Sequence, residues 1–109
     1  MNFSELPLHE QVLTGIERTG FEQCTDVQQR VLPVTLAGKD VMVQSKTGSG
    51  KTAIYAITIL QSFITAQADN REVKALIIAP TRELAVQIKA DIDELAGGVN
   101  NFRVGCFFG

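Results

Sequence analysis

Hydrophobic residues recur along the chain with two different spacings, one helical and one typical of strands. Four stretches repeat apolar residues every three or four positions, which predicts helices, the first and fourth amphipathic and the third largely buried. They cover residues 8–20, 25–32, 51–66 and 82–96. Three shorter stretches are rich in apolar residues, which predicts strands, and the continuous apolar run of the second is typical of a sheet covered on both faces. They cover residues 41–44, 73–79 and 102–108. Because helices and strands alternate, we expect an α/β fold with a parallel sheet flanked by helices.

The ends and inner faces of these helices can be predicted residue by residue. Thr25 is expected to cap the second helix, and Gly20 and the pair Gly97–Gly98 are expected to end the first and the fourth. Pro33 should kink or end the second helix, because proline lacks the amide hydrogen that a helix uses. The residues expected to face the core are Val12, Leu13, Ile16, Ile54, Ile57, Leu60, Ile64, Leu84, Ile88, Ile92 and Leu95.

Composition and charge narrow the class of protein. The 109 residues correspond to about one small domain, 45% hydrophobic, with a net charge of -2. Charges of both signs are mixed, so any contact with nucleic acid should be local rather than driven by bulk positive charge. From the composition of the first residues we expect no signal peptide, the longest apolar run is too short to span a membrane, and Cys24 and Cys106 have no metal or redox spacing. We therefore expect a cytoplasmic protein with two reduced thiols and no membrane contact.

The segment SKTGSGKT, which begins at Ser45, lies between a predicted strand and a predicted helix, as a phosphate-binding loop does. Gly48 and Gly50 allow backbone angles that a side chain forbids, so that successive amide groups can point into one hollow. Lys51 supplies a cation for the outer phosphates, and the hydroxyl of Thr52 can ligate Mg²⁺. The pattern G-x-x-x-x-G-K-[ST] is met except at its first position, which is Ser45. Kinases, transporters, GTPases and motor proteins carry related loops, so the loop alone indicates a nucleoside triphosphate and not a reaction.

Three blocks of the sequence resemble the N-terminal part of the DEAD-box family of ATP-dependent RNA helicases. GFEQCTDVQQ resembles the adenine-reading Q motif of that family, G-F-x-x-P-T-x-I-Q. SKTGSGKT looks like motif I, in which a small residue commonly replaces the first glycine. APTRELAVQ resembles motif Ia, P-T-R-E-L-A-x-Q. The order and spacing of the blocks agree with the family as well, and the resemblance covers essentially the whole chain.

The resemblance implies an ATP site. Gln28 would hydrogen-bond the adenine edge through a carboxamide that offers both a donor and an acceptor, so ATP would be preferred over GTP. Phe21 would pack on the adenine face, Thr25 would support the loop, and Phe3 matches an upstream aromatic residue. The residues that would bind the phosphates are Ser45, Lys46, Thr47, Gly48, Ser49, Gly50, Lys51 and Thr52. Of these, Lys51 and Thr52 are the expected catalytic pair, and Thr52 is the expected ligand of Mg²⁺.

The resemblance also implies contact with RNA. Pro80, Thr81, Arg82 and Glu83 would lie beside the sugar–phosphate backbone of bound RNA. Thr81 and the first turn of the helix that follows could donate hydrogen bonds to phosphate oxygens, and Arg82 could pair with a phosphate or a carboxylate. Gly109 looks like the first half of a glycine pair that lies near the same backbone.

The sequence departs from the family at one motif position and lacks several of its motifs. Cys24 replaces a proline of the Q motif, which should loosen the turn before Thr25 and weaken adenine binding somewhat. The Asp-Glu-Ala-Asp sequence, the Ser-Ala-Thr motif and the second RecA-like domain do not occur in this sequence. In the family, strands that carry the first two lie between those at 41–44 and 73–79, which would therefore have unpaired edges. We expect the chain alone to be marginally stable without a partner, self-association or the rest of the polypeptide.

The resemblance therefore implies a partial, truncated RecA-like P-loop domain over residues 1–109, with a Q-motif region at 1–38 and a P-loop and motif Ia region at 39–109. It implies an N-terminal fragment of an ATP-dependent RNA helicase that works with ATP, Mg²⁺, RNA and the remainder of the helicase. The parent protein would couple ATP hydrolysis to separation of RNA duplexes or to remodelling. This chain lacks the acidic motif and should not hydrolyse ATP efficiently by itself. Three alternatives stay open: a non-catalytic module that binds nucleotide or RNA, another P-loop ATPase such as a DNA helicase or a transporter, and a fragment with no stable activity of its own.

Overall fold

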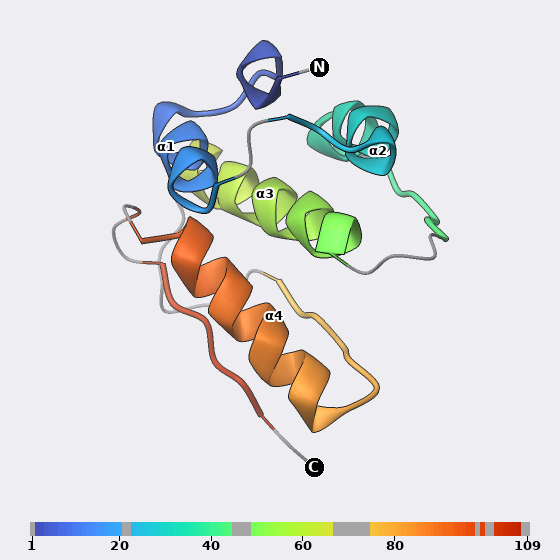
Figure 1. Cartoon of the computed structure of the whole chain (residues 1–109), viewed down its shortest axis with the longest axis vertical. Coiled ribbons are helices and arrows are strands. Elements are labelled where there is room, and N and C mark those ends of the chain that lie inside the picture. Colours follow the sequence, from blue (N-terminus) through green and yellow to red (C-terminus); the bar gives the residue numbers. More distant parts are fainter. Residues whose placement is uncertain are drawn as a thin grey trace.

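The computed structural model describes residues 2–20, 23–44, 49–66, 75–97, 99 and 102–107. Within these residues it contains a short 3-10 helix, η1 (Phe3–Glu5), and the helices α1 (Glu10–Arg18), α2 (Asp26–Leu36), α3 (Ser49–Thr65) and α4 (Arg82–Leu95). Helix α3 lies in the middle and contacts the other three helices, with α1 and α2 above it and α4 below it in Figure 1. The four predicted helices are confirmed. None of the described helices is both long and apolar enough to span a membrane.

The predicted helix ends are mostly confirmed. Thr25 caps α2, because its hydroxyl accepts a hydrogen bond from the backbone N–H of Gln28 at 3.3 Å. Gly20 follows α1 with a φ of 87°, a left-handed conformation that glycine adopts without strain. Helix α4 ends at Leu95, and Gly97 follows shortly after. Gly98 lies outside the described residues.

Pro33 does not end α2, since the helix continues to Leu36; a kink at Pro33, the other expectation, stays a prediction. Proline removes one backbone donor, and Pro33 itself is exposed to solvent. Leu32 is completely buried against α3, and the hydroxyl of Thr35 lies 2.8 Å from that of Thr58 on α3. These contacts on both sides of Pro33 hold the last turn of α2 in place despite the missing hydrogen bond.

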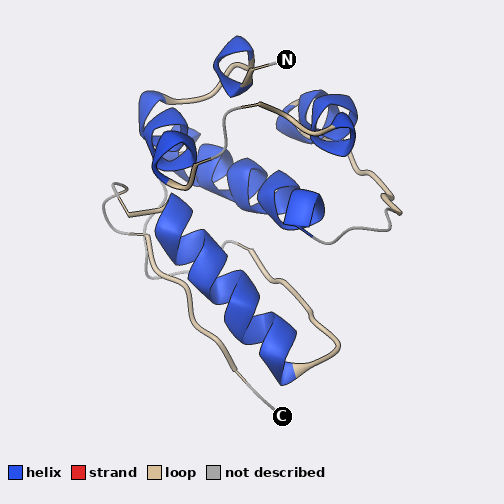
Figure 2. Ribbon diagram, in the orientation of Figure 1, coloured by secondary structure: helices blue, strands red, loops and turns tan. Residues whose placement is uncertain are grey.

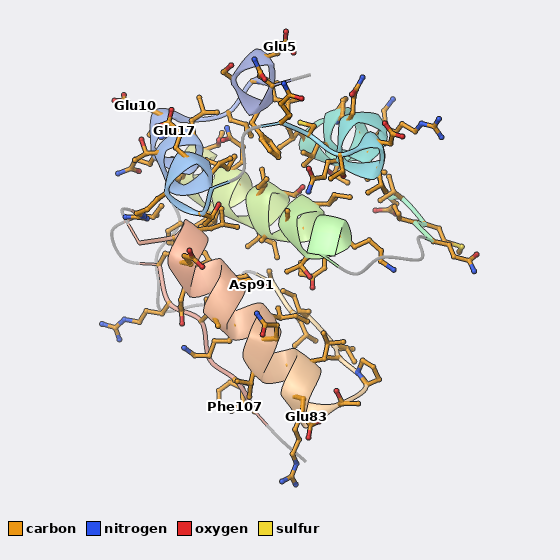
Figure 3. All side chains as sticks on the ribbon, viewed as in Figure 1. Glu5, Glu10, Glu17, Glu83, Asp91 and Phe107 are labelled. Carbon is orange, nitrogen blue, oxygen red and sulfur yellow. The ribbon has the colours of Figure 1, made fainter. Side chains whose placement is uncertain are left out.

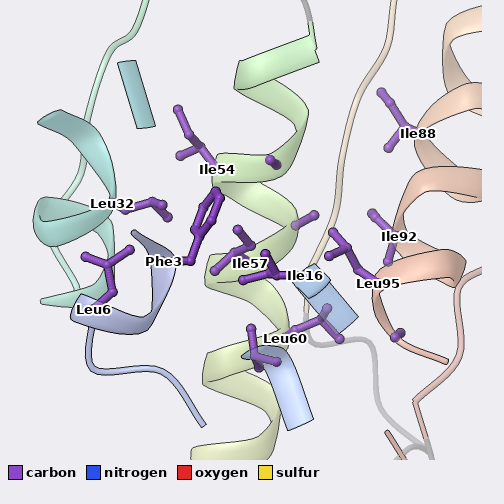
Figure 4. Close-up of a cluster of buried hydrophobic side chains, with 14 residues drawn as sticks. Phe3, Leu6, Ile16, Leu32, Ile54, Ile57, Leu60, Ile88, Ile92 and Leu95 are labelled. Carbon is purple, nitrogen blue, oxygen red and sulfur yellow. The ribbon is translucent and has the colours of Figure 1, made fainter. Parts of the chain in front are cut away.

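The core is built around α3. Ile57 and Leu60, on α3, have no exposed surface. Figure 4 shows side chains from η1 and α2 on one side of α3 and side chains from α4 on the other. The largest of these flanking residues are Phe3, Leu6, Leu32, Ile88, Ile92 and Leu95. Covering on two sides explains why α3 is apolar around most of its circumference, as its sequence predicted.

One residue predicted to face the core is exposed. Leu84 keeps 41% of its surface accessible, whereas Ile88, four residues later on the same face of α4, is buried. The N-terminal end of α4 extends away from α3 in Figure 1, so Leu84 has no helix to pack against. Helical spacing assigns a residue to a face, but it does not say how far the neighbouring helix reaches.

The three segments predicted as strands carry no β ladder where the structure describes them, at 41–44, 75–79 and 102–107 (Figure 2). The β pairing found in the described part is a single bridge between Asn2 and Gln23. A ladder needs a neighbouring strand, and the sequence lacks the motif strands that would lie between the first two segments.

Strand-like alternation of burial nevertheless persists in the second and third of these segments. Ile77 packs against the core, while Leu76 and Ile78 on either side of it are 81% and 86% exposed. Residues 102–107 alternate in the same way, half-buried and exposed, and Phe102 is held against α3 by an edge-on contact with Phe63. Residues 75–79 and 102–107 therefore cover the helices with one face and leave the other face to solvent, whereas 41–44 is mostly exposed.

Candidate functional site

Gln28, in the first turn of α2, is a buried polar residue that joins α2 to α3, with 3% of its surface exposed. Its Oε1 accepts a hydrogen bond of 2.9 Å from the backbone N–H of Thr25, and its Nε2 donates one of 3.3 Å to the carbonyl oxygen of Gly50. Because one partner is a donor and the other an acceptor, the carboxamide has a single orientation. One lone pair on Oε1 and one hydrogen on Nε2 remain for a ligand.

Gly50 is a point of close approach between α3 and α2. A Cβ atom on Gly50 would lie 3.2 Å from Thr25 Oγ1 and 3.3 Å from Val27 Cγ1, closer than ordinary van der Waals contact. Gly50 lies within α3, and the described glycines with a positive φ are Gly20 and Gly38. The prediction that Gly50 is required for an unusual backbone angle is therefore wrong. Close packing of α2 on α3 is what favours glycine here.

The first turn of α3 has the chemistry of an anion site. Lys51 and Thr52 lie in this turn and are half-buried. The turn contains no acidic residue, so no carboxylate of its own neutralises the partial positive charge of the helix N-terminus. The hydroxyl of Tyr55 donates to Thr52 Oγ1 at 3.4 Å. Sequence analysis did not identify Tyr55, although its position three residues after Thr52 on a helix indicates the contact.

Several predicted site residues lie outside the described residues: Phe21, Ser45, Lys46, Thr47, Gly48 and Gly109. Ser49 is described by its backbone, which opens α3. Phe3 is 3% exposed and belongs to the core beside α3 (Figure 4). The described part of the candidate nucleotide site therefore consists of Thr25, Gln28, Gly50, Lys51 and Thr52.

Cys24 precedes the cap of α2, at the position where the resemblance expects proline. Cys24 and Cys106 are both free thiols, as predicted. Burial raises the pKa of the Cys24 thiol above its ordinary value. The group therefore remains a protonated thiol at neutral pH.

In the part of the chain that the structure describes, no cluster of three or more His, Cys, Asp or Glu residues could hold a metal ion.

The candidate RNA contact is at the start of α4. Thr81 is the N-cap of this helix, and its Oγ1 accepts a hydrogen bond of 3.1 Å from the backbone N–H of Leu84. The Thr81 hydroxyl keeps its own hydrogen for donation to a ligand. Pro80, Arg82 and Glu83 are exposed around it, and Figure 3 shows Glu83 at the end of α4 that lies away from α1.

Thr81→Ala is expected to lower the free energy of unfolding by about 1 kcal/mol, because the amide of Leu84 loses its cap. Thr81→Ser is the matched control, since serine keeps the oxygen and should unfold like the wild type. Urea unfolding followed by circular dichroism measures both. A Thr81→Ala protein as stable as the wild type would contradict the capping role.

Comparisons with known proteins agree on one family. The sequence profile described as DEAD/DEAH box helicase matches residues 25–109. The chain is similar to the ATP-dependent RNA helicase RhlB of Pasteurella multocida, with 50% identity over 93 residues, 84% of this chain and 22% of the relative. It is also similar to RhlB of Salmonella arizonae, with 45% identity over 111 residues, 98% of this chain and 26% of the relative. The chain thus spans about a quarter of the length of these relatives.

Solved structures show the same similarity. A DEAD box protein from the hyperthermophile Methanococcus jannaschii superimposes with a TM-score of 0.80 and 39% identity, over 92% of this chain and 27% of that chain. The Saccharomyces cerevisiae protein Dbp5, in a structure bound to Gle1 and IP6, superimposes with a TM-score of 0.75 and 32% identity, over 88% of this chain and 24% of that chain.

These similarities confirm the predicted fold class, a partial RecA-like α/β domain. The matched region includes α2, α3 and α4, and with them Gln28, Lys51 and Thr81. The chain belongs to the DEAD/DEAH box helicase family.

Proposed function

We propose that this chain forms the ATP-binding part, and a share of the RNA path, of an ATP-dependent RNA helicase. The observation that carries the proposal is the hydrogen bond between Gln28 and the carbonyl of Gly50. It joins the group expected to read adenine to the helix expected to hold the phosphates. Residues 1–38 would serve base recognition, and residues 39–109 would serve phosphate and RNA binding.

The orientation of the Gln28 carboxamide supports adenine as the base. Thr25 and Gly50 each use one hydrogen-bonding position of this group, so one acceptor position and one donor position remain. Adenine offers the complementary pair, a donor at N6 and an acceptor at N7. Guanine places an acceptor at position six, so its oxygen would face Oε1 of Gln28. We therefore expect ATP to bind more tightly than GTP, with Phe21 stacking on the base.

The start of α3 fits the phosphate end of the nucleotide. The helix N-terminus and Lys51 favour negative charge, and the turn has no acidic residue. Residues 45–48 would complete the cradle with their backbone amides. The Thr52 hydroxyl is a hard oxygen donor of the kind that Mg²⁺ prefers, and Mg²⁺ would neutralise phosphate charge when bound. Lys51 and Thr52 are the residues that we propose act in catalysis within the complete enzyme.

RNA would contact the start of α4. Pro80, Thr81, Arg82 and Glu83 are exposed at the helix N-terminus, where a phosphate oxygen can accept from backbone amides and from the Thr81 hydroxyl. Gly109 would join this path. The net charge of -2 favours a few local contacts over a broad basic surface.

The complete activity would require the remainder of the helicase. The sequence has no Asp-Glu-Ala-Asp motif, so an acidic pair that positions metal and water would come from elsewhere in the polypeptide. The parent protein would couple ATP hydrolysis to separation or remodelling of RNA. The second candidate is a non-catalytic module that binds nucleotide and RNA, which the lack of an Asp-Glu-Ala-Asp motif in this sequence favours.

The free thiols of Cys24 and Cys106 support a reducing compartment, the cytoplasm.

Competition binding on this chain tests the proposal. A fluorescent ATP analogue is displaced by ATP or GTP in the presence of Mg²⁺, and a fluorescent single-stranded RNA is displaced by unlabelled RNA or by DNA of the same sequence. We expect ATP to compete roughly tenfold better than GTP, and RNA better than DNA. Equal competition by ATP and GTP would contradict the adenine assignment, and equal competition by DNA would favour a DNA helicase.

A further inference from the structure

Helices α1 and α4 meet at the C-terminal end of α4, and Gly15 lies in the contact. Gly15 is buried in the middle of α1. A Cβ atom on Gly15 would clash with the backbone carbonyl oxygen of Leu95, a residue that is 2% exposed. The clashing atom belongs to the backbone and cannot rotate aside as a side chain can. Any side chain at this position must therefore push the end of α4 away from α1.

Arg18, one turn further along α1, holds the same end of α4. Its guanidinium donates from Nη2 to the carbonyl oxygen of Glu94 at 3.2 Å. That carbonyl belongs to the last turn of α4, where backbone acceptors lack partners within the helix. Helix α4 has no basic residue in its own last turn, so Arg18 supplies the positive charge that a helix C-terminus favours. Arg18 also covers Gly97, where a Cβ atom would lie 2.6 Å from Nη2.

Within the described residues, the opposite end of α4 is more exposed to solvent. Ile88, Ile92 and Leu95 are buried in the C-terminal part of the helix, whereas residues 81–84 are exposed. Figure 1 shows the C-terminal end of α4 beside α1 and its N-terminal end projecting from the body. A helix of 14 residues is about 21 Å long and moves as a rod. A tilt imposed at Leu95 is therefore transmitted to Thr81.

We infer that Gly15 and Arg18 are positioning residues for the RNA contact at residues 80–83. They fix the orientation of α4 by a close backbone contact and a C-terminal cap, and so determine where its N-terminal end meets RNA. The inference rests on the proposed RNA contact. It adds a role for α1, a helix without residues in either candidate site.

Binding measurements on variants of this chain test the inference. Gly15→Ala and Arg18→Ala are each expected to weaken binding of a fluorescent single-stranded RNA about fivefold or more, because misplaced contacts are lost steeply. ATP affinity should stay within about twofold, since Gly15 and Arg18 do not contact α2 or the first turn of α3. Arg18→Lys should recover part of the affinity, because lysine can still donate to the Glu94 carbonyl. Glu17→Ala, on the exposed side of α1 in Figure 3, is the matched control and should bind RNA at least as well as the wild type.

Salt dependence distinguishes a positioning role of Arg18 from direct contact with RNA. Affinity falls as salt rises, and loss of a direct phosphate contact makes the slope of log affinity against log salt less steep by about one. A positioning role leaves that slope unchanged while affinity falls. A less steep slope in Arg18→Ala, or RNA affinity equal to that of the wild type in both variants, would overturn the inference.

A distance measurement provides a readout that does not need RNA. Spin labels at Ser62→Cys on α3 and Val86→Cys on α4, with Cys24 and Cys106 replaced by serine, report the orientation of α4. The inference expects the distance to shift or broaden in Gly15→Ala and in Arg18→Ala; unchanged distributions would overturn it. Arg18 is exposed, so Arg18→Ala keeps the test valid if Gly15→Ala does not fold. A wild-type chain that fails to bind RNA would overturn the proposed RNA contact, and the distances would then decide the positioning claim alone.

Discussion

Gln28→Ala is expected to lower the free energy of unfolding by about 2–3 kcal/mol and to remove the preference for ATP over GTP. The wild-type carboxamide is buried and bonds both the Thr25 amide and the Gly50 carbonyl. Truncation leaves these two backbone groups without partners and opens a gap between α2 and α3. Loss of stability and loss of base selectivity should therefore appear together in the same variant.

Gln28→Glu is the matched control for this prediction. Glutamate has the same shape and still accepts from Thr25, but its carboxylate cannot donate to the Gly50 carbonyl. We expect stability and ATP preference to fall in this variant as well, although the gap is not opened. Urea unfolding and competition by ATP and GTP measure the two effects. A Gln28→Ala protein with wild-type stability would show that the contact between α2 and α3 does not depend on this side chain.

Lys51→Ala is expected to weaken ATP binding by about 100-fold, equivalent to roughly 2.7 kcal/mol. Lys51 lies in the first turn of α3, where the helix dipole and the lysine charge would act on the same phosphates. The fold should be little affected, since Lys51 is half-buried and the core residues of α3 begin at Ala53. Thermal unfolding checks this second expectation.

Lys51→Arg separates charge from geometry. Arginine keeps the positive charge but is longer and planar, so it should recover only part of the ATP affinity. Titration calorimetry with Mg-ATP measures both variants. ATP affinity within about threefold of the wild type in Lys51→Ala would rule out a phosphate-binding role for this residue.

The helices were predictable because periodicity and caps are local properties. Ile57 and Leu60 recur at helical spacing, and both are fully buried in α3. Thr25 followed by Gln28 is a sequence signature of a capped helix start, and the structure shows the reciprocal bonds. The course of α2 beyond Pro33 was not predictable, because it depends on packing against α3 and not on the proline alone.

The strand segments show where local pattern is insufficient. Leu76, Ile77 and Ile78 have the composition of a buried strand, and their burial alternates as in a strand. A ladder also needs neighbours, which are set by chain connectivity and not by composition. The structures of relatives, which extend well beyond this chain, establish the fold class that these segments alone do not display.

The candidate site was predictable in part. Gln28, Lys51 and Thr81 stand out through the blocks they occupy, and the structure places each at the start of a helix. Gly15 and Arg18 carry no comparable signal, because their importance lies in tertiary contacts with the end of α4. Such contacts join residues about 80 positions apart, beyond the reach of any local pattern.

A ¹⁵N–¹H correlation spectrum of the purified chain is the most direct test of whether α2 and the start of α3 form one ATP site. The spectrum is recorded with and without Mg-ATP. A single site predicts dispersed peaks, in which the side-chain amide of Gln28 and the backbone amides of Gly50 and Lys51 shift together while that of Glu83 does not. A spectrum in which ATP leaves these three signals unchanged, whether the peaks are dispersed or collapsed, would contradict it.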